Sequence, residues 1–125
     1  MGKTVISTPE APAAIGPYAQ AILAGETLYS SGQLGIDPSS GKLAEGVEAQ
    51  TRQSLTNIDA ILLCAGFQKT DVVKTVVYIT DMDSFAAVNE IYASFFGTHK
   101  PARSCVEVSR LPKGGLVEIE IVAMK

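Results

Sequence analysis

The segment that most constrains the fold is the run of β-branched residues from Val72 to Ile79. Valine, threonine and isoleucine dominate this run, and its apolar side chains follow one another almost without interruption. That composition is typical of a strand in the middle of a sheet, covered on both faces. The sequence therefore predicts a core built around one central strand.

Two helices are predicted, one before this strand and one after it. Apolar or small residues recur every three or four positions over 47–65, the spacing that gives a helix one buried stripe, and Gly66 supplies its end. The second helix lies between Asp81 or Asp83, either of which can cap it, and Gly97. Its predicted buried side consists of Phe85, Val88, Ile91, Tyr92 and Phe95.

The remaining strands are predicted near the two ends of the chain. They cover 4–6, 19–23, 27–30, 103–108 and 116–124, with the second and third forming one hairpin and the last two another. The order favours a single α+β domain over 1–125, with a mostly antiparallel sheet of about six strands and two helices on one face. The other sheet face would expose too much apolar surface for a monomer, so self-association is expected.

Composition excludes several classes of function. Hydrophobic residues make up 46% and charged residues 18% of the 125 residues, which argues against disorder. The net charge of −3, without a Lys/Arg cluster, makes nucleic acid an unexpected partner. No apolar run approaches the ~20 residues of a membrane span, and no signal peptide is evident, so a cytoplasmic protein is expected. Its two cysteines should then be free thiols, and a single histidine leaves too few ligands for structural zinc.

The strand over 103–108 is the first candidate for chemistry. Alternation places one set of side chains on a polar face and the other set in the core, the polar set being Arg103, Cys105 and Glu107 and the core set Ser104, Val106 and Val108. In the last strand, Glu118 and Glu120 lie opposite an apolar set. If the two strands pair, these polar groups converge. The convergence indicates either a surface ion pair or a site that grips a small acidic substrate through Arg103.

Cys105 and Asn89 each have two possible interpretations, whereas Cys64 has one. Cys105 is either a small core residue or a thiolate whose pKa Arg103 lowers. Asn89, on the second helix, is either solvated or directed at a ligand. Cys64 is interpreted as packing beside the buried stripe of the first helix.

Five short motifs stand out along the chain, namely Gly16-Pro17-Tyr18-Ala19-Gln20, Ser30-Ser31-Gly32-Gln33, Pro101-Ala102-Arg103-Ser104-Cys105-Val106-Glu107-Val108, Leu111-Pro112 and Val117-Glu118-Ile119-Glu120. The C-terminal motifs are the most specific, because an Arg-Ser-Cys segment followed at this distance by Leu-Pro and Glu-Ile-Glu is not a generic pattern. Together these motifs resemble the reactive intermediate deaminase family (RidA, YjgF-like), with a likeness that extends from about Thr4 to Met124.

The resemblance implies a chorismate-mutase-like fold assembled as a homotrimer, with sites in the clefts between subunits. It also implies hydrolysis of 2-imino acids, or of 2-enamino tautomers such as 2-aminoacrylate, to 2-keto acids and ammonia without a cofactor. A non-catalytic trimer that holds 2-keto acids or regulates a partner is the alternative. A ribonuclease is less favoured, because it needs an acid/base pair and a basic surface.

The resemblance also implies roles for individual residues. Arg103 would hold the substrate carboxylate, Glu118 would position the attacking water, and Cys105 would line the pocket, chiefly through backbone polar groups. Further substrate-binding positions are expected at Tyr18, Ser31, Gly32 and Asn89. Since an imine carbon is already electrophilic, orientation of water and substrate can supply much of the acceleration.

Overall fold

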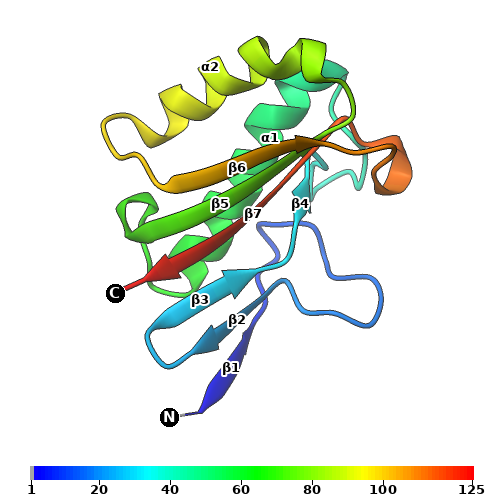
Figure 1. The fold of residues 1–125 in the computed structure, drawn as a ribbon. Coiled ribbons are helices and arrows are strands. Elements are labelled where there is room, and N and C mark those ends of the chain that lie inside the picture. The colour runs from blue at the N-terminus through cyan, green and yellow to red at the C-terminus, as the bar shows by residue number, and fades with distance from the viewer. Residues whose placement is uncertain (1) are drawn as a thin grey trace.

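The computed structural model describes residues 2–125 as two α-helices packed on one face of a seven-stranded sheet (Figure 1). Three short 3-10 turns, η1 to η3, interrupt the connections. In chain order the elements are β1 (Lys3–Ile6), β2 (Ala21–Ala24), β3 (Thr27–Ser30), β4 (Gln33–Leu34), α1 (Gly46–Cys64), η1 (Lys69–Asp71), β5 (Val72–Ile79), η2 (Met82–Ser84), α2 (Phe85–Phe96), β6 (Ala102–Glu107), η3 (Pro112–Gly114) and β7 (Val117–Met124).

The sheet runs in the order β1, β2, β3, β7, β5, β6, and β4 pairs with β7 beside β3. All neighbouring strands are antiparallel except β5 and β6, which α2 connects as a parallel pair. The predicted hairpin of β2 and β3 is confirmed. β5 does lie between two strands, but only one of its faces is buried within residues 2–125, so the predicted cover on both faces is wrong for one chain. This arrangement fits an α+β fold with a mostly antiparallel sheet.

The predicted hairpin of β6 and β7 is wrong. Both strands pair with β5, which lies between them, so β6 becomes the edge of the sheet. The physical reason is the connection through α2, because a helix between two strands allows them to lie parallel and adjacent. The chain then passes over the end of β5 through η3 before β7 begins.

The core lies between the sheet and the helices. Along β7 every second side chain is buried against the helix layer, as the alternation predicts. The stripe on α1 is confirmed by its fully buried members Leu55, Ile58, Ile61 and Leu62. Full burial of such side chains stabilises a fold by about 1.5–3 kcal/mol each. Within residues 2–125 no helix is both long and apolar enough to cross a bilayer.

Within residues 2–125, no layer of helices or strands covers the opposite face of the sheet (Figure 1). Pairing across the sheet places Val5, Tyr29, Val106 and Met124 on this open face. All four are exposed, Tyr29 at 52% and Val106 at 42% of their surface. The predicted uncovered apolar face is therefore present.

Two local predictions need correction. Cys64 at the end of α1 is exposed rather than packed, and its thiol lies 3.6 Å from the carbonyl oxygen of Ser7. Asp81 does act as a cap, but it caps η2 by accepting from the amide of Asp83, while Ser84 precedes α2 without a side-chain cap. Gly66 and Gly97 do follow the two helices with positive φ angles of 84° and 65°.

Candidate active site

Arg103 lies on the edge strand β6 and projects toward α2. It pairs with Thr75 of β5, a buried residue of the helix-covered face, so Arg103 shares that face. Its Nη1 donates a 2.7 Å hydrogen bond to Asn89 Oδ1. Its guanidinium also lies 4.8 Å from the ring centre of Tyr92 and 5.6 Å from that of Phe85. Three contacts from α2 thus hold the guanidinium while leaving most of its donors unused.

The orientation of the polar set on β6 therefore differs from the prediction. Arg103 and Cys105 share the helix-covered face, whereas Val106, predicted to be in the core, lies exposed on the open face. Glu107 accepts a 2.7 Å hydrogen bond from the amide of Met82 and so helps to hold η2. The reason is that α2 packs on the Arg103 face of β6, whereas Val106 lies on the open face of the sheet.

Tyr92 and Thr75 form a buried support for Arg103 that the sequence pattern did not reveal. Their hydroxyls lie 2.7 Å apart. Burial raises the pKa of Tyr92, although the bond to Thr75 and the charge of Arg103 oppose that change. The available signal was the spacing of Tyr92 three residues after Asn89, which places both on one face of α2.

Cys105 is partly buried on the same side of β6 as Arg103. Burial raises the pKa of its thiol, and the charge of Arg103 offsets this only in part. The interpretation of Cys105 as a thiolate with a lowered pKa is therefore wrong. Because β6 has no outer partner strand within residues 2–125, its outward backbone groups remain available to a ligand.

A cavity of about 380 Å³ opens beside Arg103. Its walls come from the C-terminal half of α2, the connection that follows and the start of β6, and they comprise Asn89, Tyr92, Ala93, Phe96, Gly97, His99, Lys100, Pro101 and Arg103. The side chain of His99 is tied to the main chain, with Nε2 2.7 Å from the carbonyl oxygen of Val72. We call this cavity with Arg103 and Asn89 the arginine half-site.

Glu118 lies on the open face of β7, directly opposite Tyr78 of β5. It is half-buried, and a methyl group added at Gly32 would lie 2.7 Å from its carboxyl carbon. Only glycine at position 32 lets this carboxyl group occupy its place. Burial, and secondly the negative charge of Glu120, raise the pKa of Glu118.

Glu118 faces a second and larger cavity, of about 590 Å³. Tyr18, Ser31 and Gly32 line it, as does the turn at Pro112 and Lys113. We call this cavity with Glu118 the glutamate half-site. Four sequence-predicted residues therefore come together there.

Hydrogen bonds fix the loops of the glutamate half-site. The hydroxyl of Ser31 donates to the carbonyl oxygen of Ala19 at 2.6 Å. The buried amide of Gln20 donates to the carbonyl oxygens of Thr8, Ala11 and Pro12, and its oxygen accepts from the amide of Thr8. The sequence analysis gave Gln20 only as the last residue of the motif that begins at Gly16, so its role in holding this loop was missed.

The predicted convergence of Arg103 with Glu118 does not occur within one chain. The two residues lie on opposite faces of the sheet and on strands that β5 separates, and the two cavities share no lining residue. Arg103 bonds to Asn89, and the carboxylates of β7 lie on the opposite face, so the interpretation of Arg103 as an ion pair across paired strands is wrong as well.

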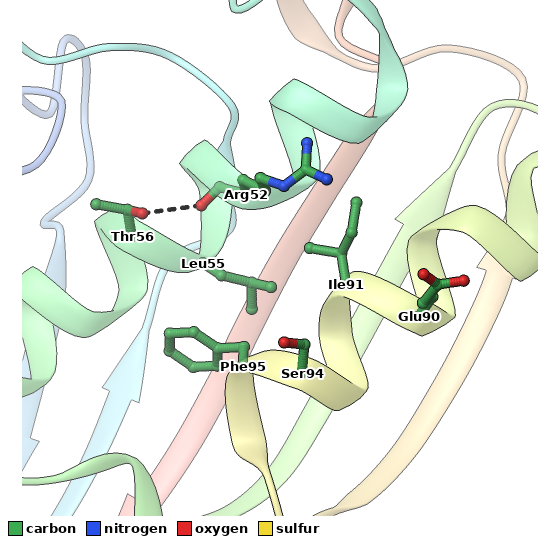
Figure 2. Close-up of a pocket in the computed structure, with 7 residues that line it drawn as sticks. All are labelled: Arg52, Leu55, Thr56, Glu90, Ile91, Ser94 and Phe95. Carbon is green, nitrogen blue, oxygen red and sulfur yellow. Dashed lines mark hydrogen bonds between the residues drawn. The ribbon is translucent and has the colours of Figure 1, made fainter.

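A third depression lies on the outer surface between α1 and α2 (Figure 2). Leu55 from α1 and Ile91 and Phe95 from α2 meet along it, with Arg52 and Glu90 at its rim. None of the predicted site residues lies there. The candidate chemistry therefore stays with the two half-sites.

Comparison with known proteins places this geometry in a family. A sequence model described as endoribonuclease L-PSP matches residues 8–125. A 2-iminobutanoate/2-iminopropanoate deaminase from Salmonella typhimurium is 51% identical over 128 residues, covering 100% of this chain and 99% of the relative. The chain belongs to the RidA (YjgF, L-PSP) family.

Other RidA-family relatives agree with this assignment. A RutC family protein from Pyrococcus horikoshii is 55% identical over 124 residues, covering 98% of each chain. The crystal structure of a protein of the conserved Rid family from Yersinia pestis is 56% identical and superposes with a TM-score of 0.96, covering 99% of this chain and 100% of that one. The expected family and fold are thereby confirmed, while the homotrimer and the residue roles stay predictions.

Proposed function

We propose that this chain hydrolyses 2-imino acids, together with their 2-enamino tautomers, to 2-keto acids and ammonia without a cofactor. The observation that carries the proposal is the likeness over the whole chain to proteins named 2-iminobutanoate/2-iminopropanoate deaminase. The preset guanidinium of Arg103 supports it, because the substrate carries a carboxylate. We expect the protein to act in the cytoplasm on imines released there by other enzymes.

Arg103 is suited to hold the substrate carboxylate. One of its five N–H donors is used by Asn89, and the aromatic rings fix the plane of the group. The remaining donors can grip a carboxylate through two parallel bonds. The substrate would then lie along β6, where backbone groups at Cys105 can bind it.

Glu118 is suited to activate the attacking water. In the proposed reaction the water oxygen bonds to the imine carbon while Glu118 takes a proton from that water. Glu118 passes this proton to the imine nitrogen as the C=N double bond becomes a single bond. It then carries the hydroxyl proton of the resulting carbinolamine to the same nitrogen, so that ammonia leaves as the C–N bond breaks and the C=O bond forms. A pKa raised by burial brings a carboxylate closer to working pH, where a base accepts a proton more readily.

We propose that each complete site joins an arginine half-site to the glutamate half-site of a neighbouring copy in a homotrimer. Two observations support this: the half-sites lie on different faces of one chain, and the open face carries exposed apolar side chains. A neighbour seated there would cover the apolar surface and supply the missing half.

The test of the activity is keto-acid and ammonia release from freshly generated 2-iminobutanoate. Loss of the carboxylate grip in Arg103→Ala should cost at least ~3 kcal/mol of transition-state binding, or about 10²-fold in kcat/KM. Arg52→Ala, which removes an exposed arginine on the far side of the helix layer, is the matched control and should keep full activity. Unchanged turnover in Arg103→Ala contradicts the proposal, and tight 2-ketobutyrate binding without turnover points to the non-catalytic alternative.

The shared site is tested by mixing two inactive variants, Arg103→Ala and Glu118→Gln, after unfolding and refolding them together. If each site takes its arginine from one copy and its glutamate from another, random mixing at equal amounts leaves one site in four intact. About a quarter of the parent activity should therefore return. A mixture as inactive as its components would show that both groups act within one chain. Native mass measurement counts the subunits.

A further inference from the structure

A second carboxylate lies beside Glu118 and is held by a tyrosine. Glu120 follows two residues later on β7 and shares the open face with Glu118. Tyr78 stands opposite Glu118 on β5, yet its hydroxyl donates to the next glutamate, reaching Glu120 Oε1 at 3.0 Å. The bond therefore runs diagonally from β5 to β7 and holds Glu120 beside Glu118 on the open face.

We propose that Tyr78 and Glu120 are positioning residues, in which the tyrosine fixes the second carboxylate beside Glu118 and thereby controls the pH at which Glu118 becomes the base. This inference rests on the proposed function insofar as it assigns a base role to Glu118. It assigns roles to two side chains that the reaction itself does not touch.

The electrostatic argument follows from strand geometry. Side chains two residues apart on one face of a strand are separated by roughly 7 Å. At that distance the repulsion between two carboxylates corresponds to roughly 0.4 pH units in water and 1.7 at a protein surface. The charge of Glu120 does act on Glu118 in this direction, after burial as the leading cause of its raised pKa.

Tyr78 matters because a free glutamate side chain can rotate its charge into solvent. The hydrogen bond to Glu120 is also the leading cause of the raised pKa of Tyr78, followed by burial and the two negative charges. The hydroxyl thus stays protonated at neutral pH and remains a donor. Glu120 is held in place throughout the range in which Glu118 titrates.

Other groups near Glu118 do not replace this effect. Across the cavity lie Tyr18 and the ammonium group of Lys113, and β4 presents the uncharged Gln33 and Leu34. In the proposed assembly, Arg103 of a neighbour would also face Glu118. Positive charges at Lys113 and Arg103 act on Glu118 in the direction opposite to Glu120, so they do not change the sign of the Glu120 contribution.

The first test compares pH profiles of kcat/KM for imine hydrolysis in the parent and in Glu120→Gln. The midpoint of the acidic limb should move to lower pH by about 0.4–1.7 units. Glu48→Gln is the matched control, since it removes one exposed carboxylate from α1 on the other side of the sheet, and its midpoint should not move. An unchanged midpoint in Glu120→Gln overturns the inference.

The second test asks whether Tyr78 acts through Glu120. Tyr78→Phe should lower the midpoint in the parent background and leave it unchanged in the Glu120→Gln background. Tyr29→Phe, which removes a hydroxyl from the same open face, serves as the control. An upward shift or no shift in the parent background overturns the positioning role of Tyr78, as does an equal shift in both backgrounds.

A readout independent of turnover separates this inference from the proposed function. Carboxyl carbon NMR of the parent and Glu120→Gln proteins follows the titration of Glu118, with Glu118→Gln assigning its signal. A parent without imine hydrolysis would refute the proposed function, yet a lower titration midpoint for Glu118 in Glu120→Gln would still support the coupling. An active parent with identical Glu118 titrations would refute the inference alone. Thermal unfolding of each variant confirms that the folded state is being compared.

Discussion

Gly32→Ala should remove activity without unfolding the protein. The added methyl carbon would lie 2.7 Å from Glu118 Cδ, 2.9 Å from Cγ and 3.0 Å from Oε1. Carbon atoms in contact are normally about 3.5–4.0 Å apart, so the carboxyl group must withdraw by about 1 Å. Only the end of a flexible side chain has to move.

The size of the effect follows from that displacement. A catalytic group misplaced by about 1 Å can cost about 10²-fold in rate, which corresponds to about 2.7 kcal/mol of transition-state stabilisation. The stability change should be small, because a rotated side chain costs about 0.5–1.5 kcal/mol and replacing glycine by alanine stabilises by about 0.4–1 kcal/mol. Gly32→Ala should therefore unfold close to the parent temperature.

Gly35→Ala is the matched control with the opposite profile. A methyl group there would meet the backbone of Gln50 in α1, namely its carbonyl oxygen and Cα, and backbone cannot rotate away. Overpacking of this kind costs about 1–3 kcal/mol, or roughly 3–5 °C in Tm for each kcal/mol in a chain of this size. The assays are 2-iminobutanoate hydrolysis and thermal unfolding at one protein concentration. A Gly32→Ala protein with full activity, or with the Tm loss expected of Gly35→Ala, would refute the reasoning.

Three further predictions concern stability. Thr75→Val and Tyr92→Phe should each cost about 1–3 kcal/mol in chemical unfolding by stranding a buried hydroxyl, and the double variant should cost less than their sum. Asn57→Ala should lower the free energy of unfolding by about 2–4 kcal/mol, because the buried side-chain amide of Asn57 donates to the carbonyl oxygens of Leu34 and Ile36 at 3.1 and 2.9 Å. Because the pKa of Glu118 is raised above its ordinary value of 4.5, the folded chain keeps that proton longer and loses stability as pH rises through this range. Glu118→Gln should accordingly melt above the parent at neutral pH, with the difference closing near pH 4; an equal difference at both pH values would contradict the sign.

Local patterns predicted the elements because they report burial along one segment. The stripe on α1 and the alternation on β7 reappear as predicted, while β5 is an interior strand with only its helix-facing side buried. Each pattern depends only on which side of its own element faces the core. Strand order depends instead on contacts between distant segments, which no single segment encodes.

The misplaced hairpin shows how such a contact is missed. The turn between β6 and β7 is locally typical of a hairpin connection. In the structure, however, β5 pairs with β6 along one edge and with β7 along the other. This changed the expected site, since it moved Arg103 to an edge and Glu118 to the opposite face. The family resemblance supplied these residues as candidates and implied sites in clefts between subunits, but it did not say which residues each chain contributes.

The sequence analysis also did not predict the buried polar contacts. Gln20 and Asn57 each satisfy backbone groups more than seven residues away in the chain, and Thr75 reaches Tyr92 across the helix layer. A hydropathy pattern records such residues as breaks in an apolar run. Their value comes from partners that only the folded chain supplies, since a buried polar group without a partner is costly.

The features that look unfavourable in one chain have a common remedy. The open face exposes apolar side chains, the outer edge of β6 has no partner strand within residues 2–125, and the described residues that line the cavity beside Arg103 include no carboxylate. Each of these three features has an ordinary explanation of its own. A single neighbouring subunit that supplies Glu118 would cover the apolar face, contact the edge of β6 and complete the cavity beside Arg103. Burial and the nearby Glu120 raise the pKa of Glu118, which disfavours its ionised form. A guanidinium arriving from a neighbour would favour that ionised form. Assembly and activation of the base would then be one event, and catalysis would depend on protein concentration wherever the assembly dissociates.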